Sequence, residues 1–166
     1  MPFLSDEKKE FIQSRIVEAY EFFSEEELMS EDGDEKITQL QLQNLQVLTS
    51  PEELHFLLNQ WNWDEGTHIP YRLLAHPACD HGTALMVYWL MDPAYYATYA
   101  SASQVPDYQQ EDFIVFKKLE DRLLNNDFNT SRIKFVPSAF AGWESQEDPK
   151  IPAALKLASP GKEWEE

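Results

Sequence analysis

In the stretch SPEELHFLLNQW (residues 50–61), the sequence signals the start of a helix more clearly than anywhere else. Ser50 is a good N-cap residue, a proline stands at the first helical position, and Glu53 follows three residues after the cap. This combination is typical of a capping box, in which the serine and the glutamate each bind a backbone N–H group at the helix start. The helix directs four apolar side chains towards a core: Leu54, Leu57, Leu58 and Trp61.

Apolar residues at three- and four-residue spacing predict further helices on both sides of this stretch. The pattern is strongest in residues 6–28, where Ser5 offers an N-cap, and in residues 107–124. Asp80 precedes an apolar run over 82–91, which we expect to be a capped helix at the centre of the fold. Weaker patterns predict shorter helices at 38–48, 70–76 and 94–100.

The sequence changes character after residue 128. Residues 132–136 alternate like a short strand, and prolines interrupt regular structure beyond them, at Pro137, Pro149, Pro152 and Pro160. We therefore predict a mainly α fold, a single-domain bundle of about six helices with a partly extended, proline-rich C-terminal tail. In this interpretation residues 1–128 form an acidic helical domain, and 129–166 form an extended segment that packs on it.

Charge limits the possible partners. Thirteen basic and thirty acidic residues give the 166-residue chain a net charge of -17. Residues 1–49 and 50–128 each carry -8, whereas 129–166 carry only -1. No cluster of Lys and Arg is available to neutralise phosphates, so we expect neither nucleic-acid binding nor attraction to an anionic membrane surface. The N-terminus lacks a secretory pattern and no apolar run is long enough for a membrane span, so we expect a cytoplasmic protein.

A possible metal site lies in residues 76–81, where His76, Cys79 and His81 fall close together. Imidazole and thiolate are good zinc ligands, but this spacing matches no specific zinc pattern. Cys79 is the chain's one cysteine, so a disulfide within the chain is impossible. A buried cysteine at a helix start, flanked by histidines, explains the same residues, and we predict no bound metal and no cofactor.

The sequence offers no recognisable catalytic motif. Adjacent carboxylates such as Glu111 and Asp112 point in different directions on a helix and so do not converge on one substrate. The run 31–35 is acidic but lacks the spacing of a calcium loop. With only five glycines and no nucleophile or phosphate-loop pattern, we predict that the protein is not an enzyme.

The stretch WNWDEG, residues 61–66, has two interpretations. It can form a helix end in which Asn62 bonds the local backbone and Gly66 adopts a positive φ angle. Alternatively, Trp61, Trp63 and Asp64 form an aromatic and acidic patch for a partner, because Trp is enriched at binding hot spots.

Three segments resemble one bacterial protein family. The quoted residues are Pro51-Glu52-Glu53-Leu54-His55, Asn62-Trp63-Asp64-Glu65-Gly66 and His76-Pro77-Ala78-Cys79-Asp80-His81-Gly82-Thr83-Ala84-Leu85. In order and spacing they look like the domain of unknown function 4274, over about residues 50–128. The resemblance implies a small bacterial cytoplasmic protein and brings no established activity. It also implies a structural signature, a turn followed by a helix cap, made by Asn62, Trp63, Asp64, Gly66, Asp80 and Thr83. His81 departs from the family pattern, which counts against a histidine–cysteine metal site.

We expect a non-catalytic domain that binds a basic protein, for example an immunity protein that neutralises a bacterial toxin. The predicted contact residues are Glu18, Glu21, Glu25, Glu26, Glu27, Trp61, Trp63 and Asp64. One alternative is a metal-binding hydrolase or sensor that uses His76, Cys79 and His81. Another is a helical adaptor or scaffold. The sequence leaves the identity of the partner and the oligomeric state open.

Overall fold

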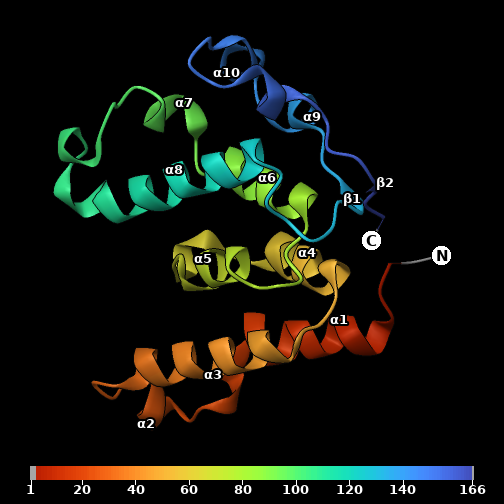
Figure 1. Ribbon diagram of the computed structural model, residues 1–166. Coiled ribbons are helices and arrows are strands. Elements are labelled where there is room, and N and C mark those ends of the chain that lie inside the picture. The colour runs from red at the N-terminus through yellow and green to blue at the C-terminus, as the bar shows by residue number, and fades with distance from the viewer. Residues whose placement is uncertain (1–2, 166) are drawn as a thin grey trace. The chain divides into compact units, whose positions relative to one another are not determined.

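Ten α-helices and one two-stranded parallel sheet form the regular structure of residues 3–165, the part of the chain that the computed structural model describes (Figure 1). The mainly α prediction is therefore confirmed. The helices are α1 (Asp6–Ile12), α2 (Glu25–Leu28), α3 (Gly33–Val47), α4 (Pro51–Gln60), α5 (His68–Leu74), α6 (His81–Leu90), α7 (Pro93–Tyr96), α8 (Gln110–Leu124), α9 (Pro137–Phe140) and α10 (Trp143–Glu147). The strands are β1 (Ile133–Lys134) and β2 (Lys162–Glu163). Among the described helices, none is both long and apolar enough to cross a lipid bilayer.

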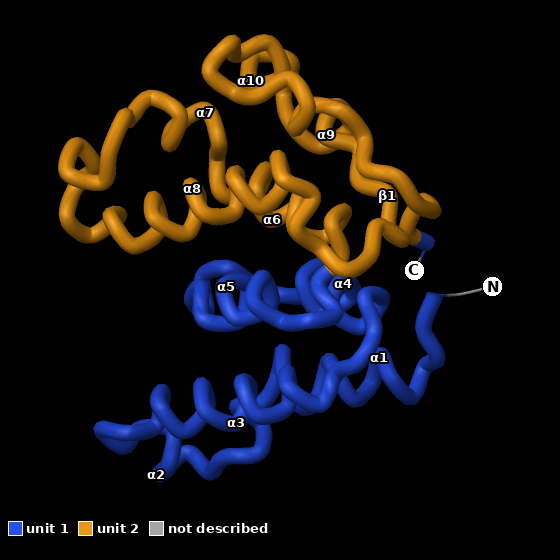
Figure 2. The backbone as a smooth tube through the Cα atoms, viewed as in Figure 1, with its two compact units in different colours: residues 1–79, 165–166 blue, residues 80–164 orange. Residues whose placement is uncertain are grey.

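The described residues divide into two compact units, which Figure 2 draws in different colours. The first unit ends at Cys79 and also includes Glu165, and the second unit is Asp80–Trp164. The boundary that the sequence suggested after residue 128 lies inside the second unit.

The first unit begins with a helix that is shorter than the periodicity predicts. Helix α1 ends at Ile12, a π-helical turn follows over Gln13–Val17, and Glu18 leaves the helical conformation with φ −104° and ψ 29°. The prediction of one helix over 6–28 is wrong because a second helix start lies inside it. Ser24 and Glu27 form a capping box that opens α2.

Helix α3 begins earlier than predicted, at Gly33 instead of near residue 38. A Cβ atom at Gly33 would lie 2.6 Å from the carbonyl oxygen of Glu27, so only glycine lets the start of α3 approach the end of α2. Helix α4 has the predicted capping box, in which Ser50 and Glu53 satisfy each other's backbone N–H groups. Lys8 of α1 pairs with Glu53 at 3.2 Å, which joins α1 to the start of α4.

The second unit is built round α6, whose side chains are largely buried, as the sequence predicts. Tyr88 of α6 stacks on Phe116 of α8 with ring centroids 5.0 Å apart. On α6, the Nε1 atom of Trp89 donates a hydrogen bond to the carbonyl oxygen of Leu155, at 2.9 Å. This bond attaches the C-terminal part of the chain to the helices of the second unit.

The C-terminal tail is partly extended, with β1 and β2 paired in parallel register. It also contains α9, α10 and a 3-10 turn at Ala153–Lys156, so it is more helical than the sequence suggested. With four prolines in its 38 residues, the tail is not clearly proline-rich.

Candidate functional site

Four of the five glutamates predicted to contact a partner have carboxylates without a bonding partner. Glu21, Glu25 and Glu26 are exposed, and Glu18 is half-buried. Their carboxylates form no ion pair or hydrogen bond within residues 3–165. Each negative charge therefore remains available to a cation from outside the described chain. An exposed carboxylate keeps its hydration shell, so leaving it without an ion pair adds little free energy to the folded state.

The fifth glutamate, Glu27, serves the fold. Its Oε2 atom accepts a hydrogen bond from the backbone N–H of Ser24 at 2.9 Å and another from the Ser24 hydroxyl. These bonds hold the pKa of Glu27 below its usual value. The carboxylate thus adds negative charge to this surface, but its first role is to cap α2.

Exposed apolar side chains accompany these carboxylates. Phe22 is 51% exposed and Met29 is 89% exposed, and Tyr20 is exposed as well. The Arg15 guanidinium lies 4.5 Å from the centroid of the Phe22 ring, a cation–π geometry. The segment therefore combines unpaired negative charge with apolar contact area, and one of its aromatic rings already binds a guanidinium.

The stretch 61–66 forms the turn that the structural interpretation predicts. Asn62 Oδ1 accepts a hydrogen bond from the backbone N–H of Asp64 at 3.1 Å, and Gly66 has φ +114°. Trp61 is buried, and its Nε1 donates to the carbonyl oxygen of Gly66 at 2.9 Å. Trp63 is half-buried and Asp64 is exposed, so only these two of the three proposed contact residues reach the surface.

Asp80 joins distant parts of the second unit. Its side chain is fully buried and caps α6 by accepting from the backbone N–H of Gly82. The same carboxylate accepts from the Thr130 hydroxyl at 2.7 Å and from the backbone N–H groups of Arg132 and Ile133. Thr83, the other signature residue of this helix start, is also fully buried. Asp80 therefore serves the fold as a helix cap, and Thr83 is part of the core.

The residues of the possible metal site have other surroundings. His76 Nδ1 accepts a hydrogen bond from the backbone N–H of Ala78 at 3.0 Å, and Cys79 is buried. The His81 ring packs edge-on against Phe128, and its buried Nδ1 has no hydrogen-bond partner in the described part of the chain. Burial lowers the pKa of both histidines. Within residues 3–165, no group of three or more His, Cys, Asp or Glu residues is arranged to hold a metal ion.

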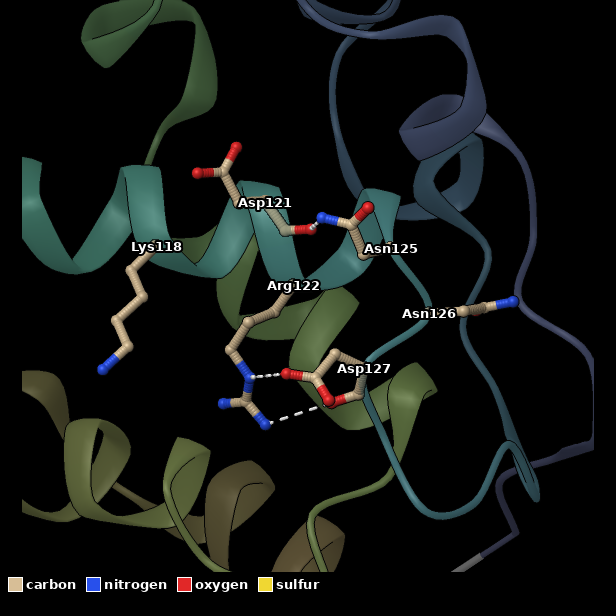
Figure 3. Close-up of a pocket in the computed structure, with 6 residues that line it drawn as sticks. All are labelled: Lys118, Asp121, Arg122, Asn125, Asn126 and Asp127. Atoms are coloured by element: carbon tan, nitrogen blue, oxygen red, sulfur yellow. Dashed lines mark hydrogen bonds and ion pairs between the residues drawn. The ribbon is translucent and has the colours of Figure 1, made fainter.

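A polar hollow of about 600 Å³ lies at the end of α8, where the sequence predicted only a helix stop. Figure 3 shows its lining residues, Lys118, Asp121, Arg122, Asn125, Asn126 and Asp127. The run Asn125-Asn126-Asp127 was the only sequence signal, and it also explains the helix end, since Asn126 adopts φ +54°.

The hollow is poorly suited to hold a small molecule. Arg122 is bound to its own chain, with Nε 3.5 Å from Asp127 Oδ2 and the guanidinium 4.3 Å from the Phe128 ring centroid. Every lining side chain is polar, whereas ligand pockets are mostly apolar with a few polar groups. No nucleophile stands next to a base among the lining residues, so the hollow provides no catalytic arrangement.

The fold, the Asn62 turn and the buried Asp80 cap together define a mainly helical protein in which side-chain caps fix several helix starts. Residues 49–124 match the family described as Domain of unknown function (DUF4274). The matched residues include all three segments of the resemblance, which is confirmed. Neither the curated proteins nor the solved structures contain a match to the chain. The family description assigns no activity, so a function must be argued from the geometry.

Proposed function

We propose that this protein is a non-catalytic binding protein that neutralises a basic protein partner, as an immunity protein neutralises a bacterial toxin. The proposed contact surface is the acidic segment, which we define as residues 18–35. The segment contains nine Asp and Glu residues and neither Lys nor Arg. This uninterrupted run of negative charge is the observation that carries the proposal. Such a local field attracts cationic proteins and raises their association rate.

The surroundings of the acidic segment support a protein partner over a simple counterion. Side chains such as Phe22 and Met29 expose apolar area beside the unpaired carboxylates. A protein interface needs both features, because apolar burial at its centre supplies affinity and charge at its rim supplies specificity. The Arg15 guanidinium lies 4.5 Å from the Phe22 ring centroid, a cation–π geometry within the chain that supports a preference of this surface for guanidinium groups.

The test is a capture experiment with the full chain. The immobilised protein is incubated with a lysate of the source cells at low ionic strength, and bound proteins are eluted with a salt gradient and identified. We expect a basic protein that elutes as salt rises, because salt screens charges that remain exposed. The control surface carries a variant with Glu18, Glu21, Glu25 and Glu26 all changed to Lys, and it should not retain that protein.

Two results would contradict the proposal. One is that no basic protein binds above background at low salt. The other is that the same protein binds equally well to the wild type and to the charge-reversed variant, since the contact would then lie outside the acidic segment. Circular dichroism of the variant serves as the folding control. The four side chains make no bond within the described chain, so their replacement should leave the helices intact.

A further inference from the structure

The tail of the second unit exposes three large apolar side chains on neighbouring elements. Phe140 ends α9, Trp143 begins α10, and Leu157 follows the 3-10 turn Ala153–Lys156. Trp143 is 69% exposed and Leu157 is 68% exposed, and Phe140 is exposed as well. Helix α9 contacts both α10 and the 3-10 turn, so the elements that carry or adjoin the three residues pack next to one another. We call these three residues the tail patch.

Exposure of this kind is unusual for tryptophan. An indole ring usually buries most of its large apolar surface, and Trp is the residue most enriched at the centres of protein interfaces. Trp89 of the same unit follows the usual pattern, because it is buried and its indole N–H bonds to the chain itself. Trp143, in contrast, is exposed, and its indole N–H bonds to no group within the described residues. An exposed indole ring of this kind favours a surface that is covered in an assembly.

The distribution of charge along the chain favours a second copy of this chain as the partner that covers the tail patch. Two copies of this chain, each with net charge -17, repel each other wherever residues 1–128 face one another, because those residues carry -16. Residues 129–166 carry only -1, so repulsion between two copies is weaker where these residues meet. Charges of both signs lie close to the patch in sequence, with Glu144, Glu147 and Asp148 followed by Lys150 and Lys156. A two-fold axis can place the acids of one copy opposite the bases of the other.

We propose that the tail patch is the interface of a homodimer, with Trp143 as its central contact and a second copy of this chain as its occupant. The inference is independent of the proposed function, because it uses a different unit and a different kind of force. The two predict opposite effects of salt. Screening weakens a complex between opposite charges but strengthens the association of two acidic copies through an apolar patch.

The test is sedimentation equilibrium of the full chain over a wide range of protein concentration, at low and at raised salt. We expect reversible association from the 19.4 kDa monomer to a dimer, and the dimer should become more stable as salt rises. Trp143→Ser should weaken the dimer by about tenfold or more, the effect of removing a central aromatic contact. The matched control is Tyr108→Ser, since Tyr108 is 82% exposed in the same unit but lies outside the patch. This control should associate like the wild type.

Three results would overturn the inference. The wild type remains a monomer at every concentration in raised salt, or Trp143→Ser and Leu157→Ser both associate like the wild type, or Tyr108→Ser weakens the dimer as much as Trp143→Ser does. Misfolding does not confuse these outcomes, because the substituted side chains are largely exposed. Circular dichroism checks that each variant keeps its helices.

Discussion

Gly82 lies in the first turn of α6, where the backbone of Ile133 leaves no room for a side chain. A Cβ atom at Gly82 would overlap the Ile133 carbonyl oxygen, which belongs to backbone that cannot move aside like a flexible side chain. The close approach brings Ile133 within reach of the buried Asp80 carboxylate, which accepts its N–H. One missing side chain thus permits the contact between the helix start and the tail.

Gly82→Ala should therefore lower the free energy of unfolding by about 3 kcal/mol, since overpacking forces the backbone to shift. The matched control is Gly142→Ala. A Cβ atom at Gly142 would meet no other atom within 4 Å, and the φ of −59° is one that alanine adopts without strain. Urea unfolding of both variants measures the difference. Equal stability of the two variants would show that the tail does not approach the start of α6 this closely.

At the scale of elements, the capped starts of α4 and α6 could be predicted, whereas the interruption before α2 was missed. Ser50 and Asp80 cap α4 and α6 as the sequence indicates, because capping depends on neighbours within three residues. The break at Glu18 was missed because the apolar period of residues 6–28 continues across it. The sequence did contain a sign of this break, because Ser24 and Glu27 form a second capping box. The continuous apolar periodicity nevertheless favoured a single helix.

The capping box of α4 predicts a dependence of stability on pH. Burial of Glu53 opposes its ionisation, but hydrogen bonds from the backbone N–H groups of Thr49 and Ser50 outweigh burial and hold its pKa below the usual value of 4.5. A carboxyl group with a lowered pKa stabilises the fold above its unfolded pKa, and this contribution is lost as pH falls through the folded pKa.

Glu53→Gln should thus cost about 1 kcal/mol at neutral pH, the usual worth of a helix cap, and progressively less as pH falls below 4.5. Urea unfolding of wild type and variant across this pH range measures the change. Glu111→Gln, which removes an exposed carboxylate from the first turn of α8, is the control for charge alone. A Glu53→Gln cost that stays constant down to about pH 3 would exclude an ionised Glu53 as the source.

At the scale of the whole molecule, charge could be read from the sequence but surface exposure could not. The acidic character of residues 18–35 can be predicted from the sequence alone. The exposure of Phe22 and Trp143 cannot, because it depends on which neighbours pack against them. Trp61 illustrates the difficulty, because the sequence placed it both on the core face of the helix in residues 50–61 and in a candidate contact patch, and the structure buries it. The hollow at the end of α8 could not be predicted from the sequence either, because its existence depends on three-dimensional packing. In the sequence, its lining residues indicate only the end of a helix.

The central claim is that the acidic segment attracts a basic protein. Its most direct test is the association rate constant of the captured partner, measured at low and raised salt for three proteins. They are the wild type, the variant with lysine at positions 18, 21, 25 and 26, and a control with lysine in place of Asp107, Glu111, Glu144 and Glu147. Both variants change the net charge by the same amount, from -17 to -9, because each Glu→Lys or Asp→Lys change adds two units.

We predict that the first variant associates about tenfold more slowly than the wild type at low salt, that the control slows far less, and that raised salt removes most of the difference. This result would place the steering field on the acidic segment. Equal slowing of the two variants would show that only net charge matters, and an unchanged rate in the first variant would contradict the claim outright.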